Sequence, residues 1–177
     1  MLIAVALAFA AVLAAWAVLA AFSPGRPARV AGEDGKPVPG SVAEKIYVEI
    51  NGVAQGMFVI GRDPGNPVLL VLHGGMPEYF LAERCRAGLE NLFTVAWWEQ
   101  RGAGVSFRPD VPRESVTAEQ LIADTVAVAN YLRRRFGKET IYLMAHSGGT
   151  IFGIQAAARH PELFAAYIGV AQIAHQV

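Results

Sequence analysis

Cysteine is almost absent from this chain of 177 residues, which contains only Cys85. A single thiol forms no internal disulfide, so the chain is not a small fold held by a disulfide framework. An excess of one charge is also missing, because 15 Lys and Arg residues balance 15 Asp and Glu residues and no basic tract occurs. Nucleic-acid-binding proteins normally show a basic patch, so we expect no nucleic-acid partner. The 54% of hydrophobic residues excludes a disordered chain.

The first 22 residues lack any charged or polar side chain. As a helix they would span about 33 Å at ~1.5 Å per residue, enough to cross a hydrocarbon core of ~30 Å. We therefore favour an uncleaved membrane anchor over a helix buried in a soluble core. A cleavable signal peptide followed by secretion is the alternative. No Lys or Arg precedes the apolar run, however, and Ala15-Trp16-Ala17 is a weak cleavage site.

The side of the membrane stays undecided. Arg26, Arg29 and Lys36 follow the apolar segment, and this bias favours a cytoplasmic body, whereas export predicts the opposite side. Residues 23–44 contain four Pro and four Gly without an apolar period, which is typical of a linker. The expected organisation is thus an anchor or signal at 1–22, a linker at 23–44 and a folded domain at 45–177.

From residue 45 onward, strand patterns alternate with helix patterns, so we expect an α/β fold with a mostly parallel sheet and flanking helices. Asn51-Gly52 predicts a hairpin that adds antiparallel strands at one edge. Thr117 and Gly137 are the expected caps of one helix. The predicted strands are 45–50, 54–60, 68–72, 93–98, 141–145 and 165–171, and the predicted helices are 78–91, 118–136 and 148–159. The last strand would leave an unpaired apolar edge.

Ser147 is the strongest candidate for chemistry. It lies in the sequence AHSGG (145–149), between a predicted strand and a predicted helix. A tight turn of this kind lifts a serine hydroxyl clear of the sheet and requires small neighbours, as in the G-x-S-x-G motif, although Ala145 replaces the first glycine. The alternative is an ordinary serine N-cap.

A glycine loop, HGGMP (73–77), follows the third predicted strand. In an acyl-transfer enzyme, such a loop supplies one backbone N–H of the oxyanion hole, and the residue after the nucleophile supplies another. These donors would be Gly75 and Gly148, while a plain glycine turn is the alternative. Met76 in this loop and His175, just beyond the last strand, are the predicted substrate contacts. His73 is expected to be a structural hydrogen-bonding residue.

A third segment, WWEQRGAG (97–104), follows the fourth predicted strand, where loops of a parallel sheet line the ligand crevice. We expect Glu99 and Arg101 to form a supporting ion pair there.

Together, the three segments resemble the α/β-hydrolase fold and, more narrowly, the proline iminopeptidase-like serine hydrolases, whose members carry HGGPG, WDQRGxG and GxSxG. The resemblance covers residue 46 to the C-terminus. Met76 stands where that family has proline, Glu99 where it has aspartate and Ala145 where it has glycine. These differences weaken a peptidase assignment relative to a general esterase or amidase.

The resemblance implies a Ser–Asp–His triad with Ser147 as nucleophile, a small-molecule or peptide substrate, and no metal or organic cofactor. The family places its acid and base much later in the chain. Only Glu162 offers a carboxylate after Ser147, and His160 and His175 are the only later histidines. The chain is therefore expected to be truncated before the catalytic Asp and His. The alternative is an inactive fragment or pseudoenzyme that serves as a binding module. An epoxide hydrolase or dehalogenase is disfavoured, since those groups use an aspartate at this turn.

Overall fold

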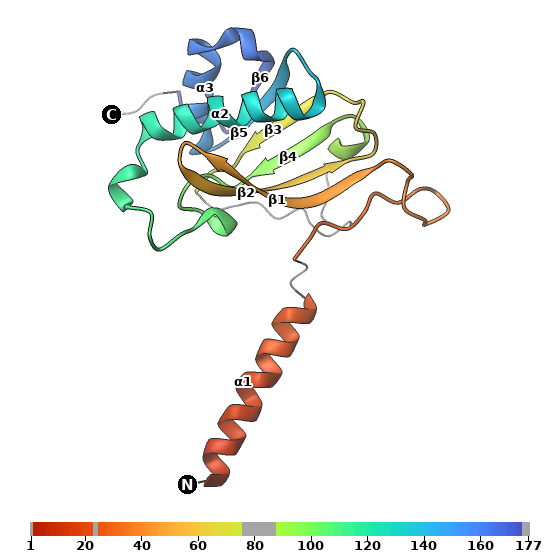
Figure 1. Cartoon of the computed structure of the whole chain (residues 1–177), viewed down its shortest axis with the longest axis vertical. Helices are drawn as coiled ribbons and strands as arrows, with labels where there is room; N and C mark the ends of the chain where they lie inside the picture. Colours follow the sequence, from red (N-terminus) through yellow and green to blue (C-terminus); the bar gives the residue numbers. More distant parts are fainter. Residues whose placement is uncertain (1, 23–24, 76–87, 175–177) are drawn as a thin grey trace.

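The computed structural model describes residues 2–22, 25–75 and 88–174. The chain begins with the helix α1 (Leu2–Phe22), which Figure 1 shows standing apart from the body. This is the apolar helix expected from the sequence. Most of the predicted helix 78–91 lies outside the described residues, and its last part forms the short 3₁₀ turn η2 (Leu89–Asn91).

The body is built on one six-stranded sheet with the order β1-β2-β4-β3-β5-β6. The two pairings at the β1 edge are antiparallel, and the pairings β4–β3, β3–β5 and β5–β6 are parallel. The predicted α/β fold, with a hairpin added at one edge of a mostly parallel sheet, is confirmed. The strands are β1 (Val42–Ile50), β2 (Val53–Gly61), β3 (Val68–Leu72), β4 (Thr94–Trp98), β5 (Ile141–His146) and β6 (Phe164–Val170).

Two helices cover one face of the sheet, α2 (Ala118–Phe136) and α3 (Gly149–Arg159). Their apolar sides form the main core with the strands, and Val128 and Leu132 are packed with Leu70 and Leu72. The predicted caps of α2 are both present. The Thr117 hydroxyl accepts a hydrogen bond from the Gln120 N–H, and Gly137 ends the helix with a φ of 62°.

The predicted linker region has structure of its own between residue 25 and β1. Val30 is buried, and Ala31 pairs with Pro37 in an antiparallel bridge. The Arg62 guanidinium donates to the Ala31 carbonyl at 3.3 Å. This segment therefore packs on the body instead of running free, and β1 begins at Val42, three residues before the predicted start.

The other end of the sheet is formed by β6, which pairs with β5. Ile168 and Val170 are exposed on this strand. Within the described residues β6 is an edge strand, as the sequence predicted.

Candidate active site

Three loops meet at one edge of the sheet because β3, β4 and β5 run parallel and end in register. Leu72 pairs with Trp98 on one side and with Ala145 on the other. The segments that follow these residues therefore begin side by side. Ligands bind at this edge in open α/β sheets.

Ser147 has a left-handed backbone with a φ of 49°, which few non-glycine residues adopt. It lies between the end of β5 and the start of α3. A serine N-cap normally has an extended backbone and caps the helix with its hydroxyl. Here Gly148 precedes α3, without a side-chain cap. The geometry therefore favours a strained strand-to-helix turn over the N-cap alternative.

Small residues surround Ser147, as the sequence predicted. A Cβ atom on Gly74 would lie 2.9 Å from the Ser147 Cβ and 3.4 Å from its Oγ. A Cβ atom on Gly149 would lie 2.5 Å from the His73 carbonyl oxygen. Neither position has room for a side chain.

Ala145, which replaces the usual glycine, is fully buried against α3. A Cβ atom added to Gly153 would lie 2.9 Å from the Ala145 Cβ. A glycine on the facing helix thus makes room for the extra methyl group.

The glycine loop lies directly beside the serine. A Cβ atom on Gly148 would lie 3.9 Å from the backbone nitrogen of Gly75 and 3.8 Å from the Gly74 carbonyl carbon. The structure therefore brings Ser147, Gly148 and the 74–75 backbone together. Met76 and His175, the predicted substrate contacts, lie outside the described residues.

The His73 ring is held by backbone groups at both nitrogens. The Gln100 N–H donates to Nε2 at 3.3 Å, so the proton is assigned to Nδ1, which donates to the Gly74 carbonyl at 2.9 Å. The Gln100 side chain also donates to the His73 carbonyl at 3.3 Å. The prediction that His73 is a structural hydrogen-bonding residue is confirmed.

The predicted ion pair between Glu99 and Arg101 is wrong. The buried Arg101 guanidinium instead binds Asp124 of α2, with Nε–Oδ2 and Nη2–Oδ1 distances of 2.8 and 3.1 Å. Asp124 is fully buried and also accepts from the amides of Asn51 and Gln55, both at 2.8 Å. Arg101 therefore connects the loop after β4 to α2, the next helix in the chain.

Glu99 turns back into its own loop, where the Val105 N–H donates to Oε2. Its other carboxyl oxygen is buried without a hydrogen-bond partner among the described residues. Burial raises the pKa of the Glu99 carboxyl, although the Val105 N–H and the Lys45 ammonium both favour its charged form.

Asp124 was not predicted as the partner of Arg101. The sequence signal that could have identified it is that Asp124 is the single carboxylate on the apolar side of the amphipathic helix α2. A buried charge requires a buried partner, and the buried Arg101 provides it.

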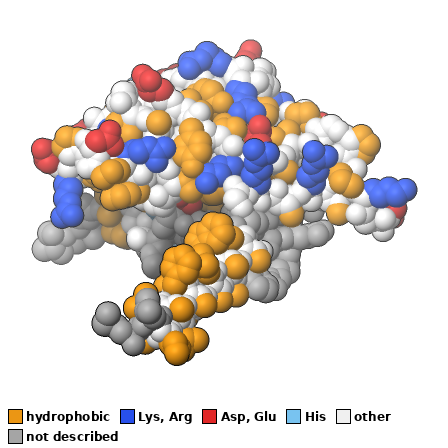
Figure 2. Space-filling model, turned by 60° about the horizontal axis from the view of Figure 1, so that its bottom comes forward, with side chains coloured by type: hydrophobic (Ala, Val, Ile, Leu, Met, Phe, Trp, Pro, Cys, Tyr) orange, Lys and Arg blue, Asp and Glu red, His pale blue; other side chains and the backbone are white. Residues whose placement is uncertain are grey.

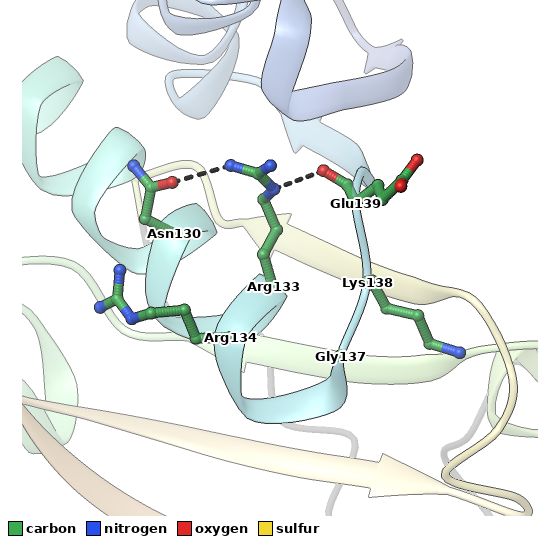
Figure 3. A pocket seen from close by; sticks show the side chains of 6 residues that line it. All are labelled: Asn130, Arg133, Arg134, Gly137, Lys138 and Glu139. Atoms are coloured by element: carbon green, nitrogen blue, oxygen red, sulfur yellow. Dashed lines mark hydrogen bonds between the residues drawn. The ribbon is translucent and has the colours of Figure 1, made fainter.

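A separate hollow of about 360 Å³ lies at the C-terminal end of α2 (Figure 3). Arg133 lies between the Asn130 side chain and the Glu139 carbonyl and donates to both. Figure 3 shows Arg134 and Lys138 pointing away from each other. The charged side chains of this hollow do not point toward a common centre. The hollow also lies near the start of β5, at the opposite edge of the sheet from Ser147.

Within residues 2–22, 25–75 and 88–174, no group of three or more His, Cys, Asp or Glu side chains is placed to hold a metal ion. What the described residues bring together at the edge where β3 and β5 end is the Ser147 side chain and the backbone of the glycine loop.

A strained serine turn beside a glycine loop, on a sheet of this topology, defines a class of protein. The chain belongs to the alpha/beta hydrolase fold family, whose model matches residues 67–176. The resemblance to proline iminopeptidase-like members of that family is also confirmed, because the chain is similar to an aminopeptidase and to a proline iminopeptidase-related protein.

The probable aminopeptidase YbaC of Bacillus subtilis (strain 168) is 35% identical over 135 residues, which are 75% of this chain and 42% of that protein. A solved proline iminopeptidase-related protein from Thermus thermophilus is 28% identical with a TM-score of 0.54, and the match covers 68% of this chain and 41% of the other. An epoxide hydrolase from Vigna radiata is 28% identical with a TM-score of 0.58, covering 71% and 39%. The chain thus spans about two fifths of the length of these relatives.

Proposed function

We propose that this chain carries the nucleophile and oxyanion-binding part of a serine hydrolase that cleaves ester, amide or N-terminal peptide bonds. The observation that carries the proposal is the left-handed backbone of Ser147 at the carboxyl edge of the sheet, packed against the Gly74–Gly75 loop. The aminopeptidase and iminopeptidase names of two relatives support the peptide-bond part of the proposal.

In the proposed reaction, the Ser147 Oγ attacks the substrate carbonyl carbon and its proton passes to a general base. The N–H groups of Gly75 and Gly148 stabilise the negative oxygen of the tetrahedral intermediate. The bond to the leaving group then breaks, and the base returns the proton to the departing nitrogen or oxygen. Water hydrolyses the acyl-enzyme by the same steps.

We further propose that the general base and its orienting acid come from a part of the protein outside these 177 residues. His160 is an unsuitable base because it follows α3, whose 11 residues span about 16 Å at ~1.5 Å per residue. It also lies 3.4 Å from Glu162. The His73 ring is bound to Gly74 and Gln100.

Two other functions compete with this proposal. Epoxide hydrolysis that starts from an aspartate nucleophile is disfavoured, since residue 147 is serine. A binding module without activity is the second competitor. Translation of the DNA downstream of Val177 separates it from the proposal, because an in-frame continuation with a late Asp and a late His supports a hydrolase.

We also propose that α1 anchors the protein to a membrane. Its residues Ile3–Ala21 have a mean hydropathy of 2.6 and none of this segment is buried. Figure 2 shows hydrophobic side chains over the exposed surface of the helix. Because α1 is apolar on all its faces, water is a poor solvent for it. A signal sequence near the N-terminus is the alternative.

The activity test uses the protein at its full natural length with three substrates, 4-nitrophenyl acetate, alanine 4-nitroanilide and styrene oxide. We expect turnover of the ester or the anilide and its loss in Ser147→Ala. Ser41→Ala is the matched control, because Ser41 donates to the Val38 carbonyl just before β1, at the opposite sheet edge. Equal activity in Ser147→Ala would rule out the proposed nucleophile.

A further inference from the structure

The Thr150 hydroxyl connects the serine turn to the chain segment that follows β6. Thr150 is fully buried near the start of α3. Its Oγ1 donates to the Ser147 carbonyl at 2.6 Å and accepts from the Ile173 N–H at 3.1 Å. One hydroxyl group thus joins two segments that lie more than 20 residues apart in the sequence.

Both backbone groups of Ser147 are held by this arrangement. Its N–H donates to the Val170 carbonyl at 2.9 Å, and its carbonyl accepts from the N–H as well as the hydroxyl of Thr150. The segment after β6 is itself turned sharply, since Ala171 has a φ of 50°. Hydrogen bonds of Thr150 and Val170 therefore connect the two segments that contain the left-handed residues Ser147 and Ala171.

A left-handed backbone is unfavourable for a residue other than glycine, so it persists only where the surrounding structure holds it in place. The direction of the Ser147 Oγ depends on this backbone, and reaction rates fall steeply when a reacting atom is displaced. We infer that Thr150 is a positioning residue, whose hydroxyl holds Ser147 in the geometry required for attack. The inference rests on the function proposed above.

The role differs from that of an ordinary buried threonine in a helix. Thr125 in α2 is also fully buried, and its hydroxyl donates to the Leu121 carbonyl at 2.7 Å within the same helix. That bond joins one helical turn to the next. The Thr150 hydroxyl instead acts on a residue outside α3 and receives a donor from another element, which makes Thr125 a matched control.

The test compares Thr150→Val, Thr150→Ala, Thr150→Ser and Thr125→Val in the protein at full natural length. The measurements are the rate of Ser147 labelling by a fluorophosphonate, kcat and KM for 4-nitrophenyl acetate, and Tm. We expect the two hydroxyl-free variants at position 150 to lose about ten- to hundredfold in labelling rate and kcat, with little change in KM. Thr150→Ser should restore most of the rate, and Thr125→Val should lower Tm without changing the rate.

Wild-type labelling rates in Thr150→Val or Thr150→Ala would overturn the inference. Failure of Thr150→Ser to restore the rate would overturn it too, since packing of the methyl group would then explain the loss. If the wild-type protein is not labelled at all, the proposed function fails separately. In that case the inference is tested by the ¹³Cα and ¹³Cβ NMR chemical shifts of Ser147. Shifts typical of a left-handed backbone in the wild type that are lost in Thr150→Ala would support the inference. Identical shifts in the two proteins would refute it.

Discussion

Ser147 lies at the sheet edge with a left-handed backbone, and small neighbouring residues leave space for this conformation. Gly74 and Gly149 leave no room for a side chain, since an added Cβ would meet Ser147 in one case and the backbone at the end of β3 in the other. The site is therefore specified as much by missing side chains as by the serine.

Replacing Gly149 with alanine tests this close packing. The new Cβ would lie 2.5 Å from the His73 carbonyl oxygen and 2.9 Å from that of Leu72, and neither backbone atom can move freely. We expect a loss of about 1–3 kcal/mol in the free energy of unfolding, measured by urea denaturation. Gly25→Ala is the control, because its Cβ would meet nothing within 4 Å. Equal stabilities of the two variants would contradict the packing argument.

Glu99 gives the protein a pH-dependent contribution to stability. The pKa of this carboxyl is raised in the folded state above its ordinary value of 4.5, chiefly by burial. Between these two values the folded state binds more protons than the unfolded state, so the contribution of Glu99 declines as pH rises through that window.

Glu99→Gln should remove this decline. We expect the free energy of unfolding of the variant to fall less than that of the wild type as pH rises from about 4.5 toward neutrality. Urea denaturation at a series of pH values measures the difference. Glu114→Gln, at an exposed carboxyl, is the control. An identical pH profile for wild type and Glu99→Gln would show that burial of Glu99 does not affect its titration.

At the scale of elements, the buried pair of Asp124 and Arg101 connects α2 to the loop that follows β4. Their side chains are 0% and 4% exposed, and the carboxylate accepts bonds from three further amide side chains. Removal of one partner leaves a buried charge without compensation, which is far costlier than the loss of a surface pair.

We therefore expect Asp124→Ala to cost about 3–5 kcal/mol of the free energy of unfolding. Asp110→Ala, at an exposed carboxyl in the same region of the chain, should cost almost nothing. In a double-mutant cycle with Arg101→Ala, the second substitution should cost much less once the first is present. Additive effects in that cycle would contradict the coupling.

Sequence patterns predicted the elements well where the signal is local. The apolar run Val68–Leu72, the Asn51-Gly52 turn and the two caps of α2 each depend on neighbouring residues, and all lie where expected. The partner of Arg101 was missed because Asp124 is brought beside it only by the packing of α2 on the sheet. The bond between Thr150 and Ile173 was missed for the same reason.

For the whole molecule, the position of the site could be predicted from the order and direction of the strands. The ordered structure of the segment before β1 could not. Three parallel strands in register necessarily bring their following loops together, so Ser147 and the glycine loop could be predicted as neighbours. Residues 25–41 look like a linker by composition, yet burial of Val30 and the bond from Arg62 fix them to the body.

Removal of residues 2–22 tests the proposed anchor. We expect the intact protein to stay with membranes after extraction at alkaline pH and the shortened form to be released, because the apolar area of α1 is exposed along its length. Immunoblotting of pellet and supernatant measures this. Release of the intact protein, or loss of these residues from the mature chain, would favour a signal sequence.

Covalent labelling shows whether the Ser147 hydroxyl acts as a nucleophile, as we propose. The folded protein at full natural length is treated with a fluorophosphonate, and the modified residue is located by mass spectrometry of its peptides. We expect one adduct on Ser147 and none in Ser147→Ala. A folded protein that stays unmodified, or an adduct on another residue, would contradict it.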